Sequence, residues 1–478
     1  MRRFLGWVRL EVVLAQTVEM VPTDGYRIEH DSMGEVRVPA HALYGAQTQR
    51  AVENFPISGL RLQRDFLAAL ALIKIAAAKA NRKLGELPEN IAEAIEEAAK
   101  QVAHGDYDDQ FVVDVFQTGS GTSTNMNANE VIAHIATRST GTEVHPNDHV
   151  NRSQSSNDVI PTAMHIAAVC QIHKQLIPAL HDLRAGLDEK ATAFHDVFKI
   201  GRTHLQDAVP MRLGDEFSGY ARQVELTIQR VELATVGLLE LALGGTAVGT
   251  GLNAPKDFSR LAIEWLREQT GFPFREADNH FEAQAAKDAV GFLSGALRAY
   301  AIVLMKIASD IRWLGSGPRC GLGELRIPAV QPGSSMMPGK VNPVIVESVL
   351  MVCAQVIGHD ASISWCCASG NFELNLMMPL MAYNLLDSIQ LLTAASANFQ
   401  ERCINGLEAD RERAAEYVEK SLANATGLVP AIGYERAAAI AWEAHRSRRT
   451  IYQVAQEQTE VSDQELRCLL DPASQVGP

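Results

Sequence analysis

The chain lacks the features that mark several common classes of protein. Its 478 residues contain no run of eighteen apolar residues, and its seven cysteines form neither a CxxC metal pattern nor a disulfide framework. We therefore expect no membrane span and no zinc site, and reduced thiols predict a cytoplasmic protein. The formal net charge of −14 argues against nucleic acid or an acidic membrane as a partner.

No internal repeat or low-complexity linker divides the chain, although its length exceeds what one hydrophobic core usually serves. The first twenty residues superficially resemble a signal peptide. However, Arg9 and Glu11 interrupt the apolar region and no small-residue cleavage site follows. We interpret residues 1–26 as a loosely attached, disordered extension, with a targeting role as the minor alternative.

Long amphipathic helices dominate the middle of the chain. Between 293 and 311, apolar residues recur at alternating spacings of four and three, which predicts a left-handed helical bundle. A similar stripe over 166–187 contains Pro178, where we expect a kink. Residues 344–364 and 376–400 have the pattern of two more such helices. The predicted organisation is a mostly helical N-terminal domain at 27–152, a long-helix bundle at 153–410 and a small C-terminal helical domain at 411–478.

The most informative segment is residues 333–343, Gly-Ser-Ser-Met-Met-Pro-Gly-Lys-Val-Asn-Pro. Its glycines and prolines favour a tight loop, and Asn342-Pro343 predicts a helix start with asparagine at N-cap and proline at N1. The loop would bring hydroxyls, Lys340 and an amide to a helix N-terminus. That arrangement suits an anion whose charge grows during a reaction. From the residue types alone, a serine-rich surface turn is equally compatible.

Two further segments are rich in glycine, asparagine and hydroxyl groups. Residues 118–125, TGSGTSTN, lack the Gly-Lys-Ser/Thr of a P-loop, so alone they fit a ligand loop or a simple capping loop. Residues 145–158, HPNDHVNRSQSSND, hold two histidines without zinc spacing, and Pro146 disfavours a helix across them. We assign no metal there and expect the next helix to begin near Asp158. Three hydroxyl and amide side chains of this segment suit a carboxylate: Ser155, Ser156 and Asn157.

A last polar segment, residues 201–207, reads GRTHLQD. An isolated histidine is more often a structural hydrogen-bonding residue than a catalyst. His204 gains weight because Thr203 precedes it and because Glu347, on the helix after 333–343, is an available acidic partner. A carboxylate bonded to one imidazole nitrogen fixes the tautomer and raises basicity, as a general acid/base requires.

These motifs resemble the fumarase/aspartase superfamily. The segment 333–343 matches its GSSxMPxKxNP signature, and the other segments resemble class II fumarases in the same order along the chain. His204 and the GNFELN stretch at 370–375 resemble fumarases, whereas Val-Ile-Val-Glu at 344–347 is closer to aspartases. Aspartate ammonia-lyase is therefore the alternative activity.

The resemblance implies a mainly α, three-domain fold whose long helices form a 20-helix core in a homotetramer. It implies reversible hydration of fumarate to L-malate in the tricarboxylic acid cycle, with a small dicarboxylate as substrate and without metal or other cofactor. Three subunits would contribute to each active site.

The resemblance also implies residue roles. Ser334 would be an alkoxide-like base, Lys340 and Asn342 would hold the aci-carboxylate intermediate, and His204, oriented by Glu347, would handle the water. The other expected substrate contacts are Thr122, Ser156, Asn157 and Thr203, supported by Ser120, Asn125 and Ser155.

A second, non-catalytic dicarboxylate site in the family involves residues that match His145, Asn147 and Asp148. Glu143 stands where relatives often carry basic residues. Because its carboxylate would repel a dianion, we expect no effective second site in this chain.

Overall fold

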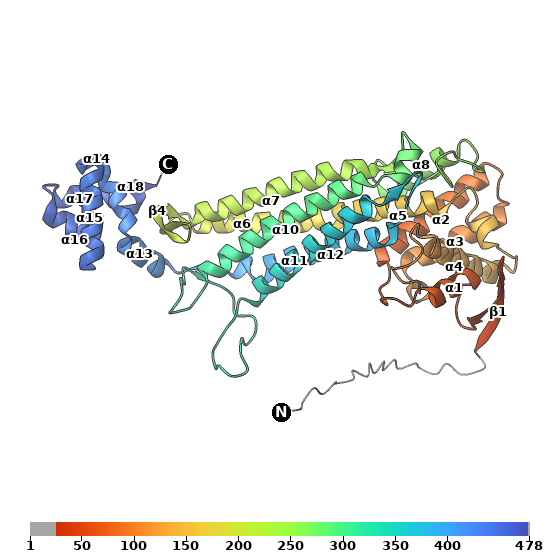
Figure 1. The fold of residues 1–478 in the computed structure, drawn as a ribbon, viewed down its shortest axis with the longest axis horizontal. Helices are drawn as coiled ribbons and strands as arrows, with labels where there is room; N and C mark the ends of the chain where they lie inside the picture. Colours follow the sequence, from red (N-terminus) through yellow and green to blue (C-terminus); the bar gives the residue numbers. More distant parts are fainter. Residues whose placement is uncertain (1–24, 477–478) are drawn as a thin grey trace, which may run out of the picture.

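The computed structural model describes residues 25–476. Figure 1 shows an elongated, mainly helical molecule, with a rod of long helices between an N-terminal region and a small C-terminal group of helices. The mainly α, long-helix architecture predicted from the sequence is confirmed. The predicted extension at 1–26 lies outside the described residues except for its last two, and Tyr26 already begins a strand.

The N-terminal region combines a hairpin with a group of shorter helices. Strands β1 and β2 pair antiparallel, with Tyr26 opposite Pro39. Helices α2 and α3 pack together because both bury apolar residues along one side, among them Leu70, Ile73 and Ile95. The elements are β1 (Tyr26–Asp31), β2 (Gly34–Pro39), α1 (Ala46–Asn54), α2 (Arg64–Lys83), α3 (Glu89–His104), η1 (Asp108–Gln110), α4 (Thr122–Thr140) and η2 (Pro146–Val150).

The central rod is built from five long helical segments. The predicted stripes at 293–311 and 166–187 are buried along their whole length, so the periodicity identified the packing faces. The helices and their short helical extensions are α5 (Ser156–Gln171), η3 (Ile172–Leu176), α6 (Ile177–Ala193), α7 (Leu213–Thr235), η4 (Val236–Leu239), α8 (Phe258–Thr270), α9 (His280–Ala285), α10 (Asp288–Leu314), α11 (Val344–Cys367), α12 (Met378–Arg402) and η5 (Ile404–Gly406).

Near Pro178, where a kink is predicted, the structure has a π-helical segment, and the kink itself stays a prediction. The chain leaves the α-helical pattern over Ile172–Leu176, between α5 and α6. Proline has no N–H to donate to the carbonyl four residues earlier, so a change of hydrogen-bond pattern just before it relieves the mismatch.

The described strands form five two-stranded sheets at the ends and edges of this rod. The β5–β6 pair is parallel and the others are antiparallel. The remaining strands are β3 (Phe198–Thr203), β4 (Gln206–Arg212), β5 (Glu240–Leu241), β6 (Arg275–Glu276), β7 (Leu325–Arg326), β8 (Gly370–Asn371), β9 (Leu374–Asn375) and β10 (Glu408–Ala409).

The C-terminal helices enclose a hydrophobic core of their own, which includes Leu428, Ile440 and Leu466. The domain boundaries at 152 and 410 stay predictions. The elements are α13 (Arg411–Lys420), η6 (Leu422–Leu428), α14 (Val429–Ile432), α15 (Tyr434–Ser447), α16 (Ile451–Gln458), α17 (Asp463–Leu469) and α18 (Pro472–Gln475).

Among the described helices, α10 and α11 are long and apolar enough to cross a membrane by length and composition alone. This is weak evidence, because core helices of soluble proteins pass the same test, and both helices pack against each other in the rod. Helix α11 nevertheless leaves large apolar side chains uncovered in one chain. Met351 is 68% exposed and Trp365 is 77% exposed.

Candidate active site

The loop at 333–343 is closed at its base by two hydrogen bonds. The N–H of Gly333 donates to the Lys340 carbonyl at 2.7 Å, and Asn342 Nδ2 donates to the Gly333 carbonyl at 2.7 Å. A Cβ at residue 333 would lie 2.7 Å from the Lys340 carbonyl oxygen, so the closure requires glycine. The predicted cap is wrong by one residue: Pro343 occupies N-cap and α11 begins at Val344. The Asn342 amide bonds the loop instead of the helix N-terminus.

Ser334 lies inside this closed loop. Its Oγ accepts the backbone N–H groups of Met336 at 3.1 Å and Met337 at 2.9 Å. Two N–H groups aimed at one oxygen stabilise negative charge on that oxygen. Lys340 is exposed and forms no ion pair with any residue between 25 and 476. The loop therefore presents a polarised serine and an unpaired cation.

A second polar cluster forms where two helices begin. Thr122 is the first residue of α4 and Ser156 the first of α5, and their hydroxyl oxygens lie 2.6 Å apart. Ser120 Oγ lies 2.8 Å from Thr122 Oγ1. Because the N-terminus of a helix carries partial positive charge and unpaired N–H groups, two such ends meeting at hydroxyl groups favour a bound anion.

The glycines of residues 118–121 allow the start of α4 to pack closely against its neighbours. Gly121 adopts a φ of +74° just before α4, a conformation that favours glycine. A Cβ on Gly119 would lie 1.9 Å from the carbonyl oxygen of Leu376, so only glycine allows this contact. The loop thus lies directly against Leu376, the residue that follows the β8–β9 hairpin. That hairpin consists of the GNFELN stretch at 370–375.

A capping box starts α5. Ser155 Oγ accepts from the Asn157 N–H at 3.2 Å, and the Asp158 carboxylate accepts from the Ser155 N–H at 2.9 Å. The helix therefore begins at Ser156, two residues before the predicted start. Ser155 and Asp158 are engaged in this cap, which leaves the Ser156 hydroxyl directed at Thr122.

Asp158 also holds the glycine-rich segment after β5. Its Oδ2 accepts the N–H groups of Gly244 at 3.0 Å and Thr246 at 2.9 Å, and Asn157 Nδ2 donates to the Ala247 carbonyl at 2.8 Å. Burial raises the pKa of the Asp158 carboxyl to about 6, although these N–H groups favour its charged form. Segments distant in sequence thus meet around the start of α5.

Asn125 points away from the solvent. It is 2% exposed, its Oδ1 accepts from Lys74 Nζ at 2.8 Å, and its Nδ2 donates to Asn151 Oδ1 at 3.1 Å. It therefore supports the wall of the cluster. Lys74 was not among the predicted residues. The one available signal was a lysine in the alanine- and leucine-rich run LALIKIAAAKA of α2.

His204 lies at the tip of the β3–β4 hairpin. Thr203 pairs with Gln206, which leaves a two-residue loop of His204 and Leu205, both with a φ of 58°. Positive φ at both positions is typical of a type I′ turn, a conformation usually taken by asparagine and glycine. Thr203 and His204 are exposed, and the His204 ring has no hydrogen bond to any other described residue.

An ion pair anchors the base of this hairpin. Arg202 donates to Glu324 at 2.6 Å and 3.2 Å, and the Glu324 side chain is fully buried. The Arg202 guanidinium also lies 5.7 Å from the ring centre of Tyr417. The pair joins the hairpin to the α10–α11 connection, the segment that carries the signature loop and projects from the rod in Figure 1.

The two sets of polar residues lie far apart within one chain. At 1.5 Å per residue, the helical segment from Ser156 to Ala193 separates the start of α5 from the His204 hairpin by roughly 55 Å. Within the described chain, no hydrogen bond or ion pair joins His204 to Glu347, and Glu347 is exposed. One chain therefore does not bring the predicted residues into one site.

Of the residues predicted for a second dicarboxylate site, Asn147 and Asp148 lie in a π-helical turn, Pro146–Val150, and His145 directly precedes it. The expectation that Pro146 disfavours a helix here is wrong, because Pro146 occupies the first turn, where its missing N–H is not needed. His145 Nδ1 accepts from the N–H groups of Asn147 at 3.3 Å and Asp148 at 3.1 Å. His145 therefore acts as a cap of this turn.

A cleft of about 540 Å³ adjoins this turn and is lined by His145 and Glu143. It also contains two further carboxylates, Glu29 and Glu130, and two arginines, of which Arg27 is paired with Glu29 at 2.6 Å. The carboxylates disfavour a dianion. The loss of the second site stays a prediction.

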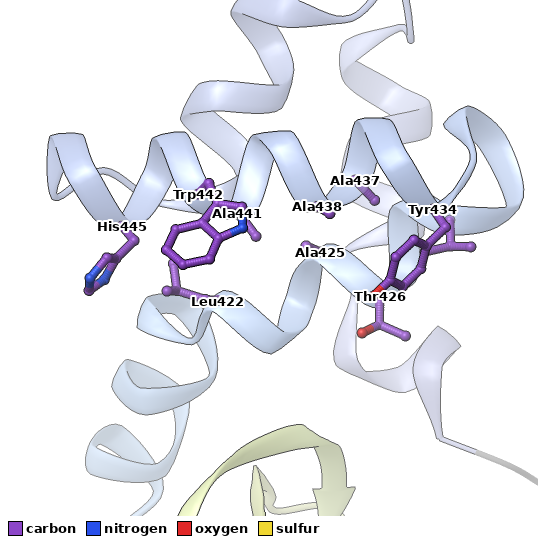
Figure 2. Close-up of a pocket in the computed structure, with 10 residues that line it drawn as sticks. Leu422, Ala425, Thr426, Tyr434, Ala437, Ala438, Ala441, Trp442 and His445 are labelled. Carbon is purple, nitrogen blue, oxygen red and sulfur yellow. The ribbon is translucent and has the colours of Figure 1, made fainter.

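Another cavity, of about 470 Å³, lies in the C-terminal group of helices and contains none of the predicted residues. Figure 2 shows its mainly apolar lining between η6 and α15, with the rings of Tyr434 and Trp442 on its rim. Both rings are largely exposed. Its polar side chains, Thr426, Tyr434, Trp442 and His445, include no carboxylate, lysine or arginine and none of the predicted residues, so this cavity is a poor candidate for the active site.

Comparison with known proteins gives the family. A family model described as lyase matches residues 34–358, and one described as fumarase C C-terminus matches residues 425–476. A fumarate hydratase class II of Mycobacterium tuberculosis is 58% identical over 429 residues, 90% of each chain.

Solved structures agree. A fumarate lyase:delta crystallin from Brucella melitensis bound to cobalt gives a TM-score of 0.91 at 46% identity, covering 95% of this chain and 100% of that one. A recombinant class II fumarase from Schistosoma mansoni gives 0.90 at 39% identity, covering 94% and 98%. The similarities favour a fumarase over the aspartase alternative. The chain belongs to the class II fumarate hydratase family.

Proposed function

We propose that this protein interconverts fumarate and L-malate, with Ser334 as the base. The observation that carries the proposal is the pair of N–H groups donated to Ser334 Oγ by Met336 and Met337. A serine hydroxyl is a poor base unless its oxyanion is stabilised, and this geometry supplies that stabilisation. The 58% identity to a fumarate hydratase class II supports the choice of substrate.

In the direction of dehydration, the Ser334 oxygen takes a proton from the carbon beside one malate carboxylate. That carboxylate then gains a second negative charge, which Lys340 and Asn342 hold. Asn342 Nδ2 has a second N–H beyond the one bonded to Gly333, so it can donate to substrate without opening the loop. Because these contacts strengthen as charge develops, they lower the barrier.

The second half of the reaction expels the hydroxyl group. His204, oriented by Glu347 across a subunit boundary, gives a proton to the leaving hydroxyl, so that water and fumarate are released. Thr122, Ser156, Asn157 and Thr203 bind the substrate carboxylates. One proton goes to Ser334 and one comes from His204, and exchange with solvent restores both groups without any redox cofactor.

The active form is a homotetramer with sites composed from three subunits. The separation of roughly 55 Å between the start of α5 and the His204 hairpin supports this, because a small dicarboxylate cannot span it. Four copies of the five long segments, α5–α6, α7, α10, α11 and α12, give twenty helices. The uncovered Met351 and Trp365 on α11 suit the apolar centre of such an interface.

The test follows the ultraviolet absorbance of fumarate, with L-malate and L-aspartate supplied separately to purified protein. Fumarate is expected from malate alone. The variant Ser334→Ala should lower turnover about 10³–10⁴-fold, while its circular dichroism stays that of the wild type. The matched control is Ser335→Ala, because no described N–H donates to the Ser335 hydroxyl.

Two outcomes would contradict the proposal. Near-normal turnover by Ser334→Ala, or loss of turnover by Ser335→Ala alone, would remove Ser334 as the base. Fumarate produced from aspartate in place of malate would mean that the leaving group is an amine, and that His204 does not mark a hydratase.

A further inference from the structure

Lys74 is a buried cation that the mechanism above does not use. Its side chain is 0% exposed on α2, and its Nζ donates to Asn125 Oδ1 at 2.8 Å, Gln154 Oε1 at 2.9 Å and Asn151 Oδ1 at 3.2 Å. All three acceptors are neutral amides, and no described carboxylate lies within ion-pair distance of Nζ. Burying an ammonium group without a paired anion is costly.

The nearest balancing charge is already engaged elsewhere. Asp158 is the one charged group that acts on Lys74 among the described residues. Its carboxylate accepts N–H groups from Ser155, Gly244 and Thr246. Burial lowers the pKa of Lys74 to about 7. The Lys74 amine is therefore only partly protonated near neutral pH when no anion is bound.

The amide partners of Lys74 lie directly behind the cluster of hydroxyl groups. Asn125 stands one turn after Thr122 in α4, and Gln154 stands two residues before Ser156 in α5. The ammonium group therefore lies on the protein side of the point where two helix N-termini meet. Positive charge from all three sources acts on whatever anion binds at Thr122 and Ser156.

We propose that Lys74 is a positioning residue whose buried positive charge strengthens binding of a substrate carboxylate at Thr122 and Ser156, acting through Asn125. The inference rests on the proposed function, because it takes the bound anion to be a dicarboxylate. It adds to that function that part of the positive charge balancing the bound carboxylate lies in the protein interior, on Lys74. A merely structural lysine would matter only for the hydrogen bonds that it makes.

Two substitutions separate charge from hydrogen bonding. Lys74→Gln removes the charge but keeps two N–H donors for the amide oxygens, whereas Lys74→Met removes both and fills similar space. Lys83→Gln, at the exposed end of the same helix, is the control for net charge. Circular dichroism melts establish that each variant is folded.

Binding of succinate, an unreactive dicarboxylate, is measured by calorimetry on the assembled protein. Lys74→Gln and Lys74→Met should each weaken succinate binding about tenfold or more, with Lys83→Gln unchanged. In activity assays the Lys74 variants should raise KM far more than they lower kcat. Wild-type affinity in Lys74→Gln, with loss in Lys74→Met only, would show that hydrogen bonds alone matter and would overturn the proposal.

A readout on the wild type does not depend on any variant folding. At pH 8, above the pKa of Lys74, a bound dianion should draw a proton onto this amine. Calorimetry in buffers of different ionisation enthalpy should therefore show proton uptake on succinate binding, which both Lys74 variants lose. Absence of uptake by the wild type, together with wild-type succinate affinity in Lys74→Gln, would overturn the proposal.

The two proposals can fail separately. Succinate binding that depends on Lys74, without fumarate formation from malate, would refute the hydratase function and leave the role of Lys74 intact. Malate turnover by Lys74→Gln with an unchanged KM would support the hydratase function and refute the role of Lys74.

Discussion

Removing the carboxylate of Glu324 should loosen the His204 hairpin and destabilise the protein. The Glu324 side chain is fully buried and Arg202 is 15% exposed, and two hydrogen bonds of 2.6 Å and 3.2 Å join them. Breaking one partner of a buried ion pair costs about 3–5 kcal/mol, because the other charge is left unpaired. Slight exposure of Arg202 allows some hydration, so we expect about 3 kcal/mol for Glu324→Ala.

The assay is urea denaturation followed by circular dichroism at one fixed protein concentration, because the proposed tetramer would make stability depend on concentration. Fumarase activity is measured alongside, since Arg202 directly precedes Thr203 and His204. The double variant Arg202→Met/Glu324→Leu should be much closer to wild type in stability than Glu324→Leu alone, because it leaves no buried charge.

The nearby pair Arg411–Asp196 serves as control. Both side chains are more than half exposed, although their two hydrogen bonds of 2.9 Å are equally well formed. Solvent screens such a pair, so Arg411→Ala should leave stability unchanged. The reasoning is refuted if Glu324→Ala is as stable and as active as Arg411→Ala, because burial would then not decide the contribution of an ion pair.

Three further changes test the site. His204→Asn should lower turnover about 10²–10³-fold, the scale of a general acid/base, with an unchanged melting temperature; a rate within a few-fold of wild type would exclude that role. Gly119→Ala places a Cβ 1.9 Å from the Leu376 carbonyl oxygen, so KM for malate should rise sharply, and an unaltered KM would show that this contact does not shape the pocket. Glu143→Lys should restore a second dicarboxylate site, seen as increased succinate stoichiometry in calorimetry; equal stoichiometry in both proteins would mean that Glu143 does not set it.

The long helices were predictable because their signal is local and repeated. Six apolar residues between 293 and 311 defined the packing face of α10, which extends only a few residues further at either end. Helix caps and starts were less accurate: the predicted N-cap of α11 is off by one residue and the start of α5 by two. The partner of a capping side chain is chosen by the surrounding fold: Asn342 bonds the Gly333 carbonyl, and Ser155 forms a capping box.

Residue types indicated which segments are polar loops and helix starts, whereas the roles of the site residues stay predictions. Hydroxyl groups at Thr122 and Ser156 do meet, 2.6 Å apart, and Ser334 does lie in a closed loop. The burial of Asn125 behind them and the role of Lys74 depend on how α2 packs across α4 and α5, which no local pattern specifies. Sequence also gave no measure of the long separation between the start of α5 and His204.

The arrangement explains how a protein of net charge −14 can bind a dianion. Its positive elements are local and fixed: two helix N-termini at Thr122 and Ser156, a pair of N–H groups on Ser334, and the unpaired Lys340. Rigid helices hold these elements at opposite ends of the rod, so in isolation each end offers too little to catalyse the reaction. In the proposed assembly, the end of one chain that carries Thr122 and Ser156 would lie beside the end of another chain that carries His204. Residues that are far apart within one chain would then meet between chains.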